Sequence, residues 1–231
     1  MTPHLQTAHC ILRTEFGVFR LHGFKDARTG LEHAALQLGA DLLDTEPVLT
    51  RIHSECLTGD VFHSLHCDCG KQLHLALRTI AEHGRGVLLY LRQEGRGIGL
   101  VNKIRAYALQ QAGADTVDAN RLLGLPDDAR DYAIAAEMLE ALGIDEVRLM
   151  TNNPAKVDGL VAHGVRVAER VSLVTPRTLD NGAYLDTKAA RMGHLLTSTI
   201  APEDADAAVL QSTDTDTETP ATATFCLSHR D

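Results

Sequence analysis

The chain contains no tryptophan and few aromatic residues of any kind, which together make up 4% of its 231 positions. We therefore expect neither a base-stacking platform nor an interface built on bulky aromatic rings. It also lacks a long apolar segment, because the longest apolar run covers only Val87–Leu91. A membrane-spanning helix needs about 20 such residues, so no membrane contact is expected.

Positive charge is also scarce, since 22 lysines and arginines stand against 31 acidic residues and give a net charge of -9. Residues 201–231 carry -6 of this charge, which leaves -3 for the rest of the chain. A mildly acidic protein is not suited to duplex nucleic acid, which normally requires a basic face. A single nucleotide held by a few local cations remains possible.

The amino terminus lacks the basic flank and the apolar run of a signal peptide. We therefore expect a cytoplasmic protein whose five cysteines are reduced thiols. The expected organisation is one domain over residues 1–196, β-rich over 9–55 and α/β over 56–196. The Thr, Ala and Asp bias of the acidic tail, residues 197–231, predicts disorder.

The order of the predicted elements indicates an α/β fold. Short strands are expected at 10–13, 18–22, 33–38 and 48–52, followed by a helix that ends at Gly84 and a buried strand at 86–91. Helices over 101–112, 132–142, 154–163 and 184–196 and strands at 147–150 and 165–173 complete the pattern. Residues 113–131 are expected to be irregular. We predict a layered mixed sheet with helices on both faces.

Three of the five cysteines lie in the segment 51–72, at Cys56, Cys67 and Cys69, with the spacing C-x10-C-x-C. Three thiolates are a suitable ligand set for zinc and would leave one coordination position for water, as in a catalytic site. Two other interpretations remain open. The thiols could simply be buried, or a histidine could complete a structural zinc site, for which the candidates are His53, His63 and His66.

A zinc deaminase is a further possibility that the same segment raises. His53-Ser54-Glu55 fits the H-x-E half of that signature. The other half, P-C-x-x-C, is missing, because Cys67 and Cys69 are only two positions apart and no proline precedes them. This mismatch makes the deaminase interpretation the weaker one.

Two predicted strand-to-helix junctions could bind an anion. In the first, Gly95, Gly97 and Gly99 would let main-chain N–H groups approach a phosphate, although glycines in such turns are often only geometric. In the second, Asn153 suits an N-cap and Pro154 the first helical position. Lys156 then lies in the first turn, where a cation opposes the helix dipole unless an anion binds there. The alternative is a solvated surface lysine.

Two further candidates have simple alternative explanations. Asp128 could start the next helix and place Arg130 on its surface, and Tyr107 could be an ordinary boundary residue.

Eight segments occur in an order that is specific when they are taken together. Read as letters, they are RIHSECLTGD, CDCG, RQEGRGIGL, NKIRAY, DT, DARDY, TNNPAK and YLDTK, beginning at positions 51, 67, 92, 102, 115, 128, 151 and 184. As a set they closely resemble GTP cyclohydrolase II, the first committed enzyme of riboflavin synthesis. The fused butanone-phosphate synthase domain of some relatives is absent, so we expect a monofunctional form.

The resemblance implies a homodimer that hydrolyses GTP to formate, pyrophosphate and a diaminopyrimidine, using Mg²⁺ and one Zn²⁺ per subunit. It implies zinc ligands at Cys56, Cys67 and Cys69. It implies GTP contacts at Arg51, Ile52, His53, Ser54, Glu55, Gln72, Glu94, Gly95, Arg96, Thr116, Thr151 and Lys156. It also implies Asp128 as proton acceptor, Arg130 as nucleophile towards the α-phosphorus and Tyr107 in proton transfer.

Two qualifications follow from the residues themselves. A guanidinium is effectively never deprotonated in proteins, so Arg130 is physically better suited to stabilising phosphate charge than to nucleophilic attack. His66 stands where the family pattern has arginine. The alternatives are a relative that stops at a formylamino-pyrimidine and a zinc-stabilised nucleotide-binding module without turnover.

Overall fold

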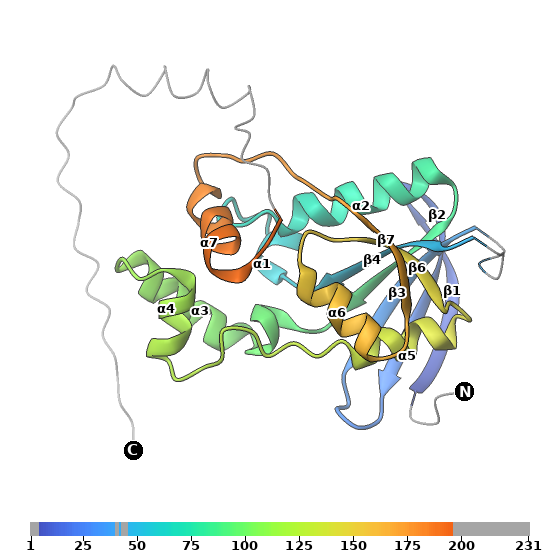
Figure 1. The fold of residues 1–231 in the computed structure, drawn as a ribbon, viewed down its shortest axis with the longest axis horizontal. Helices are drawn as coiled ribbons and strands as arrows, with labels where there is room; N and C mark the ends of the chain where they lie inside the picture. Colours follow the sequence, from blue (N-terminus) through green and yellow to red (C-terminus); the bar gives the residue numbers. More distant parts are fainter. Residues whose placement is uncertain (1–4, 40–41, 43–45, 196–231) are drawn as a thin grey trace.

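The computed structural model describes residues 5–39, 42 and 46–195, and one seven-stranded sheet runs through this part of the chain (Figure 1). The predicted disordered tail lies outside the described residues. The strands are β1 (Leu5–Thr14), β2 (Gly17–Asp26), β3 (Glu32–Leu38), β4 (Val48–Ser54), β5 (Gly86–Leu91), β6 (Glu146–Met150) and β7 (Arg166–Val171). Their order in the sheet is β1-β2-β3-β5-β4-β6-β7.

The sheet is mixed, as predicted. β1, β2, β3 and β5 pair antiparallel in turn, whereas β5, β4, β6 and β7 form parallel pairs. Nearly every residue of β4 and β5 is buried, which agrees with their central position and, in β5, explains the continuous apolar composition. β1 forms an edge of the sheet and is mostly exposed.

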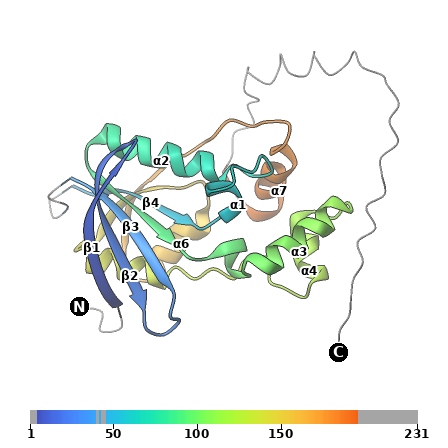
Figure 2. The ribbon, with the colours of Figure 1, turned by 180° about the vertical axis from the view of Figure 1, so that it is seen from behind.

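Helices cover both faces of the sheet, which confirms the predicted layering (Figures 1 and 2). The helices are α1 (Leu57–Asp60), α2 (Cys69–His83), α3 (Leu100–Gln111), α4 (Thr116–Leu122), α5 (Ala133–Ala141), α6 (Pro154–Ala162) and α7 (Gly182–Met192). α2 packs on one face, and α5 and α6 pack on the other. α3, α4 and α7 lie together beyond the end of the sheet at which β4 and β5 finish (Figure 1).

The predicted elements are confirmed, but their ends shift by up to five residues: β1 begins at Leu5 and not at residue 10, and β2 ends at Asp26 and not at residue 22. Gly84 ends α2 in the left-handed region, at φ 78°, as the sequence indicated. The segment 113–131 is corrected, because α4 lies inside it. Asp115 caps α4 by accepting hydrogen bonds from the N–H groups of Val117 and Asp118 at 2.8 Å. This helix has seven residues, too few for its apolar spacing to stand out.

The topology gathers three strand ends at one place. Parallel β4, β5 and β6 finish at the same edge of the sheet, so the segments after Ser54, Leu91 and Met150 meet there. Ligands of open α/β sheets commonly bind outside such carboxyl ends. No described helix has the length and apolar character needed to cross a membrane.

Candidate active site

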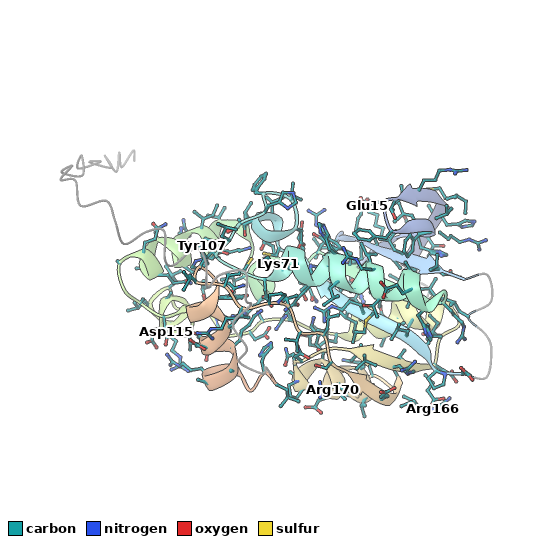
Figure 3. All side chains as sticks on the ribbon, turned by 90° about the horizontal axis from the view of Figure 1, so that it is seen from above. Glu15, Lys71, Tyr107, Asp115, Arg166 and Arg170 are labelled. Carbon is teal, nitrogen blue, oxygen red and sulfur yellow. The ribbon has the colours of Figure 1, made fainter. Side chains whose placement is uncertain are left out.

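A pocket opens at this edge of the sheet and collects most of the predicted site residues. Those that line it are Arg51, His53, Ser54, Glu55, Cys56, Cys69, Gln72, Glu94, Gly95, Arg96, Tyr107, Thr116, Arg130, Thr151 and Lys156. The side chain of Ile52 is buried in the core beneath α5 and α6, and its main-chain oxygen accepts a hydrogen bond from Lys156. Tyr107 and Asp115 lie at the pocket end of the molecule, far from Glu15 in the β1–β2 turn (Figure 3).

The three predicted metal ligands come together, with their sulfur atoms all within 4.8 Å of one another. Cys56 precedes α1, while Cys67 and Cys69 stand at the start of α2. Gly59 makes this approach possible, because a Cβ there would lie 2.8 Å from Cys67 Sγ and 3.2 Å from Cys56 Sγ. The α1 turn therefore packs directly against the sulfurs.

The three neighbouring thiols shift one another's pKa values, so that only one of them readily becomes a thiolate without a cation. Hydrogen bonds with the other two cysteines lower the pKa of Cys56, with Lys103 adding to the effect. The hydrogen bond to Cys56 raises the pKa of Cys67 to about 11. Hydrogen bonds with Cys56 and Cys67 raise the pKa of Cys69 well above its ordinary value. A divalent cation would allow all three to be thiolates. The donor set therefore fits zinc.

No fourth protein ligand joins the cluster within the described part of the chain, where the metal-binding group consists of the three cysteines. His53 Nε2 lies 3.0 Å from Asp60 Oδ1, and His66 Nε2 lies 3.0 Å from Gln110 Oε1. This favours a site with an open coordination position over a closed structural site. Glu55 is hydrogen bonded to Arg92 at 2.8 Å, which further weakens the deaminase interpretation.

Arg51 is held in the wall of the pocket by a network of hydrogen bonds. It is 5% exposed and donates to Met150 O at 2.8 Å and to Gln72 Oε1 at 2.7 Å. Gln72 donates in turn to Asp68 Oδ2, and Asp68 Oδ1 accepts from Lys188 of α7 at 2.9 Å. Burial lowers the pKa of Arg51 to about 10. Asp68 lies between Cys67 and Cys69 in the sequence, so these hydrogen bonds connect two predicted metal ligands to α7.

Lys156 is not a surface residue, so the alternative interpretation from the sequence is wrong. It is 5% exposed, and its Nζ donates to Ile52 O at 2.8 Å. Asn153 caps α6 and Pro154 follows, as predicted. Burial lowers the pKa of Lys156 well below its usual value, and the charges of Arg51, Arg130 and Lys188 lower it further. Positive charge is thus concentrated here and would be stabilised by a bound anion.

The glycine-rich loop differs from the expected phosphate cradle. The N–H groups of Gly95, Gly97 and Gly99 donate within the loop, to Glu94 Oε1, Gln93 O and Glu94 O. Arg96 adopts a φ of 61°, which is uncommon for a residue with a side chain and is often found at functional sites. The glycines therefore form a tight turn that directs the side chains of Glu94 and Arg96.

Glu94 links the loop to the cysteine cluster. Its Oε2 accepts from the N–H of Leu57 at 2.7 Å, and its Oε1 accepts from Lys103 Nζ at 2.7 Å. Lys103 also donates to Cys56 Sγ at 3.1 Å. Burial opposes the charge of Lys103, but Cys56 and Glu94 hold its pKa above the usual value.

Asp128 and Arg130 form a bidentate ion pair, with Nε–Oδ1 and Nη2–Oδ2 distances of 2.8 and 2.5 Å. α5 begins only at Ala133, so Arg130 is not on a helix surface as the simpler interpretation supposed. Burial disfavours both charges, but the pairing holds the pKa of Asp128 below and that of Arg130 above their usual values. The pairing therefore favours the charged form of Arg130 in this arrangement.

Tyr107 reaches towards the cysteine cluster from α3. Its hydroxyl oxygen lies 3.4 Å from Thr58 Oγ1, which is 3.6 Å from Cys56 Sγ. Burial raises the pKa of Tyr107, so its hydroxyl keeps its proton.

Sequence reasoning assigned no role to two pocket lysines, Lys103 and Lys188, although both lie in segments that carried the resemblance. Lys103 stands near the start of α3, where its charge opposes the helix dipole. The same conflict with the helix dipole that marks Lys156 in the sequence also marks Lys103. Lys188 gave no comparable local signal.

The comparison with known proteins completes the description of the site. The sequence model of GTP cyclohydrolase II matches residues 5–172. The chain belongs to this family. A GTP cyclohydrolase-2 from Azotobacter vinelandii is 63% identical over 187 residues, which cover 81% of this chain and 89% of that protein. One from Cronobacter sakazakii is 58% identical over 191 residues, which cover 83% and 96%.

A two-domain 3,4-dihydroxy-2-butanone 4-phosphate synthase from A. baumannii is a distant structural neighbour. It has a TM-score of 0.42 and 15% identity over 73% of this chain and 40% of that one. Family membership identifies the protein as an enzyme of the GTP cyclohydrolase II type.

Proposed function

We propose that the protein catalyses the zinc-dependent hydrolysis of GTP that begins riboflavin biosynthesis. The imidazole ring opens at the C8 carbon, formate and pyrophosphate are released, and 2,5-diamino-6-hydroxy-4-(5-phosphoribosylamino)pyrimidine is formed. One observation carries the proposal: Cys56 and Cys69, of a three-cysteine cluster suited to a metal, line the same pocket as a set of buried cations. The proposal includes one zinc per subunit, magnesium, a homodimer and a cytoplasmic location.

The cysteine side of the pocket suits ring opening. A zinc ion held by the three sulfurs would supply Lewis acidity, which makes water a stronger nucleophile near neutral pH. Breaking the ring C–N bond leaves a nitrogen that needs a proton. The hydroxyl of Tyr107, connected to the cluster through Thr58, is protonated and can donate one.

The cationic side of the pocket suits the triphosphate. Arg51, Arg130, Lys156 and Lys188 can stabilise negative charge on phosphate oxygens during departure of pyrophosphate. Magnesium binds triphosphates through their oxygens and keeps several waters, so we propose that it enters with GTP.

Asp128 could act as proton acceptor after an exchange of partners. It is paired with Arg130, which makes it a weak base. If Arg130 turns towards a phosphate, the carboxylate loses that partner and becomes a better base. We therefore propose that phosphate binding activates Asp128, and that Arg130 acts through its charge.

One assay tests the proposed function. Purified protein is incubated with GTP, Mg²⁺ and Zn²⁺, and formate and pyrophosphate are measured. Release of both products is expected. Pyrophosphate without formate would indicate an enzyme that stops early, and neither product with GTP still bound would indicate a binding module.

Replacement of a metal ligand tests the cysteine site. Cys67→Ser is expected to lose bound zinc and formate release, whereas Cys10→Ser, at an exposed cysteine of β1, should retain both. Full formate release by Cys67→Ser would refute the metal site.

A further inference from the structure

Lys103 is a buried cation at the boundary between the glycine-rich loop and the cysteine cluster. It projects from α3, is 8% exposed and lines the pocket. Its Nζ lies 3.1 Å from Cys56 Sγ and 2.7 Å from Glu94 Oε1. Burying a charge is costly unless partners compensate for it, and these two atoms lie within reach.

The local structure gives no other reason for a cation at this position. Gly99 caps α3, so Lys103 stands in the first turn, where positive charge opposes the helix dipole. The stem of the side chain is also packed against the loop, since a Cβ on Gly95 would lie 3.2 Å from Lys103 Cβ. Contacts at the tip of the side chain must therefore account for the charge.

The charge at that tip matches the needs of a three-thiolate metal site. Three thiolates around a divalent cation leave an excess of one negative charge. An ammonium that donates to one of the sulfurs offsets this charge, and hydrogen bonds to charged acceptors are among the stronger ones. Groups that contact metal ligands from outside also fix their orientation and tune the metal.

We propose that Lys103 is a positioning residue for the metal site. Its ammonium holds the Cys56 sulfur towards the other two cysteines, offsets the repulsion among the thiolates and joins them to Glu94. This inference rests on the proposed metal-dependent function.

The simpler explanation is that Lys103 only forms a structural ion pair with Glu94. That pair alone would hold the loop in place without changing the electron density on Cys56 Sγ. A measurement that reports directly on the sulfur–metal bond separates the two explanations.

Cobalt(II) provides this measurement, because cobalt–thiolate sites absorb through a sulfur-to-metal charge transfer. Loss of a donor to the sulfur makes it a better electron donor, which moves the band to longer wavelength. The probe is Co²⁺ alone, titrated into the metal-depleted full-length protein. The variants are Lys103→Met, Lys103→Gln, which keeps a neutral donor, and Lys103→Arg. The control is Lys71→Met, an exposed lysine on α2 (Figure 3).

We expect the band of Lys103→Met to move to longer wavelength and its Co²⁺ affinity to fall by about 10- to 100-fold. Lys103→Gln should show a smaller shift, and Lys71→Met none. An unchanged band and affinity in Lys103→Met would overturn the inference. If that variant does not fold, an unchanged band in Lys103→Gln would do so.

The result also separates this inference from the proposed function. If the wild-type protein shows no thiolate band with Co²⁺, the metal site itself is wrong and the inference falls with it. If the wild-type band appears and is lost in Cys67→Ser but does not respond to Lys103, only the inference is wrong.

Discussion

The tight packing of Gly59 against the sulfurs predicts that Gly59→Ala damages the metal site. The added Cβ would lie 2.8 Å from Cys67 Sγ, 3.1 Å from Cys69 Cβ and 3.2 Å from Cys56 Sγ. Ordinary contact begins at 3.4 Å, so the nearest sulfur must move by about 0.6 Å. Metal–ligand distances tolerate only about 0.2 Å, so the displacement exceeds what the site allows.

Two effects on stability compete in this variant. Replacing glycine by alanine in a helix normally stabilises by about 0.5–1 kcal/mol. Overpacking a buried site costs about 1–3 kcal/mol, and Gly59 is buried. We expect overpacking to dominate, with a net loss of about 1–2 kcal/mol and at least a roughly tenfold loss of metal affinity.

Differential scanning fluorimetry and Co²⁺ titration would measure these two losses. Gly159→Ala in α6 is the matched control, because its Cβ would lie 2.5 Å from the Tyr132 ring and away from the cysteines. It should lower the melting temperature and leave the cobalt spectrum unchanged. A Gly59→Ala protein with wild-type metal affinity and stability would refute the reasoning.

Three further predictions concern the cations of the pocket. Lys156→Met should raise the KM for GTP about tenfold or more. The pKa of Lys156 in the folded state lies well below the ordinary value of 10.5. Between these two pKa values the unfolded chain binds more protons than the folded one. The unfolding free energy of the ligand-free protein should therefore rise as the pH is raised through this range. Denaturant titrations should show this rise in the wild type and a smaller one in Lys156→Met.

Arg130→Lys keeps the charge but loses the bidentate geometry, so pyrophosphate release should fall about 100-fold in steady-state assays; wild-type release would exclude Arg130 from this role. Lys188→Met leaves Asp68, whose side chain is 1% exposed, without its cation. Chemical denaturation should show a loss of about 3–5 kcal/mol, and an unchanged midpoint would contradict it.

The sequence by itself determined the features that depend on neighbouring residues. The spacing of Cys56, Cys67 and Cys69 indicated converging sulfurs, and the structure brings them together. The Asn153-Pro154 helix start and the Gly84 helix end were also confirmed. Local patterns report such features reliably, because caps and turns satisfy main-chain groups within a few residues.

Only the tertiary structure decided how distant residues are paired. Lys103 contacts a sulfur 47 positions away, and Lys188 contacts a carboxylate 120 positions away. Both pairings depend on the sheet order, in which β4 lies between β5 and β6. The glycine loop shows the same limit, since its sequence suggested free N–H groups that the folded turn uses internally. A buried lysine and a surface lysine look alike in a local sequence pattern, because burial is set by elements that are far apart in the chain.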